Sequence, residues 1–233
     1  YEFNRQVTGF AEARGIPWTD ARVTSADLNA LWEAGCEALF SAGYIYRIPV
    51  DTPLRCANVH PALLPLGRGP WPMPCTILRG LRESGVTIHK VAAGLDTGDI
   101  LLQEPFPVTG QDTLETMTET IRALAPRLAA QVVQSFDQLW EKAVPQGEGE
   151  YWKEPTEEEM TFTPWDSLER VDRIVRAFAG YGSFLRLGEE TLTVVRGEVI
   201  PGGAEAPPGT LRLEHGIPQY ALKGGWMRLY ESQ

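Results

Sequence analysis

The chain has 233 residues, of which 43% are hydrophobic and 22% charged, proportions that are typical of a folded globular protein and exclude a disordered one. No apolar run approaches the roughly 20 residues that cross a bilayer, and the start lacks the pattern of a signal peptide, so we expect a cytoplasmic protein without a membrane partner. The formal net charge of −10 disfavours nucleic acid as the main partner, because Lys and Arg supply most non-specific affinity for phosphates.

Apolar residues recur at helical spacing in the first part of the chain. One helix is predicted over residues 3–15, ending at Gly15, and a second begins at Thr24 or Ser25 and ends at Gly35. The three cysteines, which lack the spacing of a zinc site, are expected to be buried, reduced thiols, and they are Cys36, Cys56 and Cys75.

Short apolar runs alternate with helical segments through the middle of the chain. This alternation predicts an α/β fold with a mostly parallel sheet and helices on both faces. The expected strands are residues 36–44, 55–63, 86–94 and 99–108, with a helix at 76–84 and a long helix at 112–144 that is interrupted or kinked at Pro126.

The last third has a different pattern. Residues 145–165 are rich in Gly, Pro and Glu and indicate a linker between a domain at 1–144 and a small domain at 166–233. Asp166 to Glu169 resembles a capping box that opens a helix, and many short strands after it predict a β-rich, open-barrel (OB-like) domain. The expected strands are residues 183–187, 191–200, 209–215, 218–223 and 226–230.

Asn58 and His60 are the first candidates for catalysis. Residues i and i+2 of a strand point to the same side, so the amide and the imidazole are presented together just before Pro61 ends the strand. Asp96 follows the next expected strand, and parallel strands gather a site at their carboxyl ends. The three groups could polarise a carbonyl and move a proton. Two structural interpretations stay open: a satisfied Asn–His pair, and an aspartate that only serves its turn.

Two longer motifs carry a family resemblance. NVHPALLPLGRGPWP and GVTIHKVAAGLDTGDILLQEPFPV together closely resemble the folate-dependent formyltransferase family, which acts on glycinamide ribonucleotide, methionyl-tRNA and amino sugars. The similarity runs over roughly residues 1–144 and continues more weakly into RVDRIVRAFAGYG and the strands after it. It implies a Rossmann-like fold, with the family's first strand and turn lying ahead of Tyr1, and a small open barrel at the end.

The resemblance implies specific roles for the three candidates. Asn58, His60 and Asp96 match the family's catalytic positions. An amine would attack the formyl carbon of 10-formyltetrahydrofolate, and Asn58 and protonated His60 would stabilise the resulting oxyanion. Asp96 would keep His60 charged or order a relay water, and no metal is required.

Further contacts are implied around this trio. The stretch SAGYIYRIP resembles the loop whose backbone holds the pterin, so Tyr46, Ile48 and Leu95 are expected to bind the folate. Arg68 is expected either to meet an anionic group of the substrate or to be a solvated turn residue, and His89 either to line its strand or to contact the substrate. Ligand type alone would also permit a metal at the histidines and Asp96, but no spacing signature favours one.

The acceptor amine is the least determined part. Residues 151–233 hold nine Lys plus Arg against thirteen Asp plus Glu, an acidic balance that disfavours a tRNA-gripping domain. We therefore expect a small-molecule acceptor, either an amino sugar nucleotide or an amine derived from an amino acid, with methionyl-tRNA as the alternative. A folate-binding module without catalysis, a formyl-folate hydrolase and a homodimeric assembly also remain open.

Overall fold

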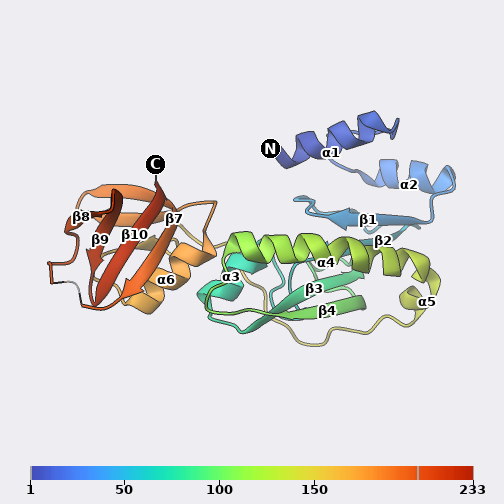
Figure 1. Ribbon diagram of the computed structural model, residues 1–233. Helices are drawn as coiled ribbons and strands as arrows, with labels where there is room; N and C mark the ends of the chain where they lie inside the picture. The colour runs from blue at the N-terminus through green and yellow to red at the C-terminus, as the bar shows by residue number, and fades with distance from the viewer. Residues whose placement is uncertain (1, 204, 233) are drawn as a thin grey trace.

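The computed structural model describes residues 2–203 and 205–232, so Tyr1 and Gln233, the outer ends of the two predicted domains, lie outside the described residues. The first part contains α1 (Glu2–Ala13), α2 (Ser25–Glu33), β1 (Ala38–Ala42), β2 (Arg55–His60), α3 (Pro72–Leu78), β3 (Glu83–Lys90), β4 (Ile100–Pro107), α4 (Leu114–Gln134) and α5 (Phe136–Glu141). The second contains β5 (Thr161–Phe162), α6 (Leu168–Ala177), β6 (Ser183–Leu187), β7 (Glu190–Pro201), β8 (Leu211–Glu214), β9 (Ile217–Leu222) and β10 (Gly225–Ser232) (Figure 1).

The first sheet has the order β1-β2-β3-β4. The α/β class is confirmed, but the strand directions differ from the prediction: among the described strands β1 and β2 are parallel, whereas β2–β3 and β3–β4 are antiparallel. Helix α3, between β2 and β3, packs through Ile77 in the buried cluster around α6 and not in the cluster between α4 and the sheet. It therefore does not return along the face of the sheet as a crossover helix would, and β3 runs antiparallel to β2.

Two helix predictions need correction. The helix expected at 76–84 lies at Pro72–Leu78, because Gly80 takes a φ of 65° just after it and the chain then enters β3. Pro126 does not interrupt α4, which runs unbroken from Leu114 to Gln134. Leu128 and Val132 of α4 share a buried cluster with Ile88 of the sheet, and the helix lies across the sheet (Figure 1).

The second sheet has the order β5-β6-β7-β10-β9-β8. It contains all five strands expected from the sequence, together with the two-residue strand β5. Helix α6 also forms as expected, although its N-cap is Ser167, whose hydroxyl accepts the N–H of Arg170, rather than Asp166. The β-rich character of this region is confirmed.

One apolar core joins the two parts of the chain. Ile77 of α3, Phe106 of β4 and Met117 of α4 belong to the same buried cluster as Phe178 after α6 and Met227 of β10. The segment between the parts is also packed rather than free, because Val144 bridges Ile100, Tyr151 bridges Arg68, and Trp152 is buried.

The cysteines divide into two groups. Cys56 and Cys75 are buried free thiols, and burial raises the pKa of Cys75 to about 11. Cys36 is exposed after the end of α2, so the prediction of burial is wrong there. Among the described residues, no helix combines the length and the apolar character needed to cross a membrane.

Candidate active site

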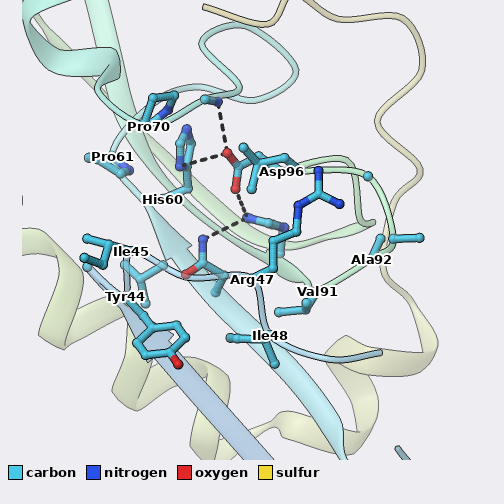
Figure 2. A pocket seen from close by; sticks show the side chains of 18 of the residues that line it. Tyr44, Ile45, Arg47, Ile48, His60, Pro61, Pro70, Val91, Ala92 and Asp96 are labelled. Carbon is cyan, nitrogen blue, oxygen red and sulfur yellow. Dashed lines mark hydrogen bonds and ion pairs between the residues drawn. The ribbon is translucent and has the colours of Figure 1, made fainter. Parts of the chain in front are cut away.

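A cavity of about 370 Å³ lies beside the end of β2. Its walls come from the loop after β1 (residues 43–48), the end of β2, the turn at 69–70 and the segment 91–96 after β3 (Figure 2). The volume is within the roughly 300–1,000 Å³ of small-molecule sites. Most of the lining residues are apolar or glycine, and the polar residues Asn58, His60, His89 and Asp96 form one group in the wall of the cavity.

His60 belongs to this polar group. Its side chain is almost entirely buried, and its Nε2–H donates to the carbonyl of Gly67 at 2.7 Å. The other ring nitrogen, Nδ1, lies 3.8 Å from Oδ2 of Asp96. Both ring nitrogens therefore face acceptors, an arrangement that suits an imidazole taking up a second proton.

His89 lies directly opposite Asn58 in the antiparallel register of β2 and β3. Its Nδ1 is 2.8 Å from the carbonyl of Lys90, and donation of the Nδ1 proton leaves Nε2 as an acceptor for the Asn58 amide at 3.3 Å. The same Nε2 is 3.6 Å from Oδ1 of Asp96. His89 thus lies between Asn58 and Asp96, which neither sequence interpretation of this histidine anticipated.

Asp96 is held in the turn after β3 with a φ of 53°, a left-handed conformation that few non-glycine residues adopt. Its Oδ2 accepts the N–H of Gly69 at 3.0 Å, and its two oxygens face His60 and His89. Because β3 is antiparallel to β2, the carboxyl ends of the two strands do not share an edge. The turn at 91–99 instead returns toward His60 and brings the carboxylate to it.

Burial and charge act in opposite directions on the pKa values of this pair. Desolvation lowers the pKa of His60, and the opposing effect of Asp96 only partly offsets it. Desolvation tends to raise the pKa of Asp96, but the Gly69 N–H and the adjacent His60, which both favour the carboxylate, outweigh it and the pKa is lowered. At neutral pH the site therefore pairs a carboxylate with a neutral imidazole that is ready to accept a proton.

Only some of the residues expected to contact the folate lie in the wall of the cavity. Ile48 and Leu95, two of the three residues expected to bind the folate, line the cavity, whereas the third, Tyr46, is not among its lining residues. Its ring instead lies 5.6 Å from that of Tyr44 and 5.4 Å from the Arg22 guanidinium. The neighbouring Tyr44, Ile45 and Arg47 line the cavity and were missed, because an irregular loop has no side-chain period that fixes which residues face inward.

Arg68 does not line the cavity. Its guanidinium instead donates to the Gln146 Oε1 from Nε at 3.1 Å and from Nη2 at 3.0 Å. Gln146 was assigned to a linker and not to the site, because nothing in the local sequence marks it. Within the described residues, no group of three or more His, Cys, Asp or Glu is arranged to hold a metal ion.

Comparison with known proteins identifies the class. The sequence profile described as formyl transferase matches residues 20–133. The methionyl-tRNA formyltransferase of Thiobacillus denitrificans is 32% identical over 232 residues, which cover 96% of this chain and 75% of that protein. The chain therefore belongs to the formyl transferase family, an enzyme family of folate-dependent N-formyltransferases.

Solved structures share the fold at low sequence identity. HypX from Aquifex aeolicus in complex with tetrahydrofolic acid superimposes with a TM-score of 0.73 at 17% identity, over 88% of this chain but only 37% of the HypX chain. The N-formyltransferase from Helicobacter canadensis, in complex with folinic acid and dTDP-3-aminofucose, gives a TM-score of 0.62 at 17% identity, covering 83% of this chain and 73% of that chain. These similarities confirm the Rossmann-like class of the fold.

Proposed function

We propose that the protein transfers a formyl group from 10-formyltetrahydrofolate to a primary amine, with Asn58, His60 and Asp96 as its catalytic residues. The observation that carries this proposal is the convergence of the three side chains in the wall of a ligand-sized cavity, with His89 between Asn58 and Asp96. Family membership supports the reaction class, and the geometry supplies the roles.

The reaction needs stabilisation of one oxygen and the movement of one proton. The acceptor nitrogen bonds to the formyl carbon, the bond from that carbon to N10 of the folate breaks, and the proton leaving the amine ends on N10. Asn58 is free to direct one amide hydrogen toward the carbonyl oxygen while His89 Nε2 accepts the other. The amide is thereby oriented before substrate arrives, and preorganisation of this kind makes such a donor effective.

His60 is suited to moving the proton. In its neutral form with Nε2–H bound to Gly67, its Nδ1 is the free acceptor, and Asp96 lies beside it to stabilise the imidazolium that forms. The residues alone predicted an imidazole that moves a proton, whereas the family resemblance implied a protonated His60 that stabilises the oxyanion, and the proposed role follows the first of these. Burial, which favours the neutral ring, is the reason for this choice.

The folate would occupy the apolar part of the cavity. Ile48 and Leu95 come from two different loops of its wall, which also contribute residues 43–45 and 91–94. Apolar walls with exposed backbone N–H and C=O groups are suited to a flat heteroaromatic ring that has both donors and acceptors. Arg47, also in the wall, carries a positive charge of the sign that a folate carboxylate would require.

The first candidate acceptor is methionyl-tRNA. The Thiobacillus denitrificans relative carries that name and aligns with nearly the whole of this chain. This relationship favours the alternative that the charge balance had placed second.

The second candidate is a small amine, favoured by the acidic balance of residues 151–233. A protein that grips tRNA should lose affinity steeply as salt rises, whereas one that binds a small amine should not. Salt dependence therefore separates the two acceptors.

The experiment begins with donor binding. Calorimetry with 5-formyltetrahydrofolate, a non-reactive mimic of the donor, should show saturable binding, and its absence would contradict the proposal. Turnover with 10-formyltetrahydrofolate should then require methionyl-tRNA or a member of an amine panel. Binding without turnover would identify a folate-binding module, and formate release without an amine would identify a hydrolase.

A further inference from the structure

Gln146 lies just after the bridge that joins Val144 to Ile100, and its side chain is nearly buried. Its Nε2 donates to the carbonyl of Asp96 at 3.0 Å and to that of Gly98 at 2.6 Å. Its Oε1 accepts both hydrogen bonds from Arg68. The amide has two N–H donors and an oxygen with two lone pairs, so these four bonds use its full capacity.

Arg68 ties this amide to the turn that contacts His60. Its main chain pairs with the segment 150–152, through its N–H to the Glu150 carbonyl at 3.1 Å and its carbonyl to the Trp152 N–H at 2.6 Å. It lies between Gly67, whose carbonyl accepts from His60, and Gly69, whose N–H donates to Asp96. The Arg68–Gln146 pair therefore contacts both turns that carry the catalytic hydrogen bonds.

Gly69 and Gly98 lie so close to neighbouring main chain that no residue with a side chain fits at either position. A Cβ added at Gly69 would lie 2.1 Å from the Trp152 carbonyl, and one added at Gly98 would lie 1.8 Å from the Lys90 carbonyl. Asp96, two residues before Gly98, adopts a left-handed backbone conformation, and its carboxylate accepts the N–H of Gly69. The turn that contains Asp96 needs an external constraint, and Gln146 binds the main chain on both sides of Thr97.

We propose that Gln146 and Arg68 are positioning residues that fix the Asp96 carboxylate against His60. The expected effect on turnover rests on the proposed function. The position of the Asp96 carboxylate beside His60 does not, and it can be tested without measuring turnover.

The test compares Gln146→Met with a matched control, Gln219→Met. Gln219 is fully buried in the second sheet and accepts from Arg212 Nε at 3.1 Å and Nη2 at 2.8 Å, the same pairing by the same atoms, but it binds no catalytic turn. Methionine has a similar shape and cannot replace the hydrogen bonds. Both variants should lower the melting temperature, because each leaves buried polar groups unpaired.

The first readout is the titration of His60 in the intact protein, followed by NMR of its imidazole, with three histidines in the chain to resolve. The titratable side chains that face His60 are Asp96, from the turn after β3, and His89, from β3 itself, and of these Asp96 raises the pKa. If Gln146→Met releases the carboxylate, the pKa of His60 should fall below its wild-type value. In Gln219→Met it should not change.

The second readout is turnover. With the carboxylate displaced, kcat should fall about 10- to 100-fold in Gln146→Met, because small displacements of a catalytic group are costly. The KM for the folate should change little. Arg68→Met, which leaves both Nε2 donors of Gln146 in place, should show the same changes in weaker form and keeps the test decisive if Gln146→Met does not fold.

An unchanged His60 titration and an unchanged kcat in a folded Gln146→Met, with only the melting temperature lowered as in Gln219→Met, would overturn the inference. If the wild-type protein shows no formyl transfer at all, the proposed function fails. The His60 titration then still decides whether the Arg68–Gln146 pair positions Asp96.

Discussion

The polar cluster of Asn58, His60, His89 and Asp96, which borders the cavity, and the apolar core beside α6 are built from opposite kinds of side chain. Around His60, the buried groups are imidazole, carboxylate and amide, each with hydrogen-bond or ionic partners. Beside α6, the buried groups are apolar, and Phe178 packs edge to face on Trp71 with ring centroids 5.7 Å apart.

The difference between the two regions lies in what their burial provides. Apolar burial stabilises the folded state directly, by about 25 cal/mol for each Å² removed from water. Burial of polar groups costs free energy that their hydrogen bonds only offset, but it removes the water that would weaken their electrostatic effects. We therefore expect stability to depend on the core beside α6 and turnover to depend on the cluster, and each prediction below tests that division.

Phe178→Ala should have the largest effect on stability. The side chain is fully buried, and deletion of a buried phenylalanine costs about 3–5 kcal/mol of unfolding free energy. Urea denaturation measures this, and turnover per folded molecule should stay near the wild-type value. Phe10→Ala, at a position that is 55% exposed, is the control and should change stability little. Loss of turnover in folded Phe178→Ala would mean that the core and the site are not separable.

His60→Ala should show the opposite behaviour. Turnover should fall about 10²–10³-fold, the typical effect of removing a group that acts in the transition state, and the affinity for 5-formyltetrahydrofolate should be retained. The double variant His60→Ala with Asp96→Asn should be far less damaging than the product of the single effects, because the carboxylate acts through the imidazole. His215→Ala, in an exposed turn, is the control. Full activity in folded His60→Ala would contradict the mechanism.

The pH dependence of stability tests how far the polar cluster itself contributes to the free energy of unfolding. The pKa of His60 is below 6.5 in the folded state, so as pH falls below 6.5 the unfolded chain takes up a proton that folded His60 does not. The unfolding free energy should decline in that window by at most about 1.4 kcal/mol per pH unit from this group. Asp96 acts lower, since its depressed pKa stabilises the fold above about 3.8 and that contribution is lost only as pH falls through the folded pKa.

This contribution can be isolated by mutation. Urea denaturation of the wild-type protein and His60→Ala at pH 7.5 and pH 5.5 measures it as the difference between their two declines. An equally steep decline in His60→Ala would show that other groups cause it.

The smallest effect is expected on the solvent side of α6. Glu169 and Arg173 form an i,i+4 pair at 2.5 Å, with side chains that are 72% and 34% exposed. Glu169→Gln should change the unfolding free energy by about 0.5 kcal/mol or less, and added salt should reduce even that difference. A larger or salt-independent effect would show that exposed charge contributes to stability here as buried apolar area does.

Local patterns in the sequence were sufficient for most elements and for three residues of the cluster. The five C-terminal strands are identified by short apolar runs between turn residues. Asn58 and His60 are identified by strand alternation and the family motif, and Asp96 by its place after the next expected strand and by the same motif. The contact of His89 with Asn58 depends on the register between two strands, and a mostly parallel sheet would not have produced it.

The contact of Gln146 with the Asp96 turn could not be predicted from the sequence for a different reason. Gln146 lies fifty residues from Asp96 in the sequence, in a segment whose composition resembles a linker, and only tertiary packing brings it there. Patterns within one segment carry no information about such a contact.

The core shared by α3, α4 and α6 limits how relatives of this protein can exchange parts. A recombination point between residues 144 and 166 would look neutral from composition, yet it would separate Ile77 and Met117 from the Phe178 side chain against which they are buried. A C-terminal part acquired from another protein would have to bring a complementary face or leave this one open to aggregation. Differences between the C-terminal parts of close relatives should therefore arise by substitution on the surface rather than by exchange of the whole part.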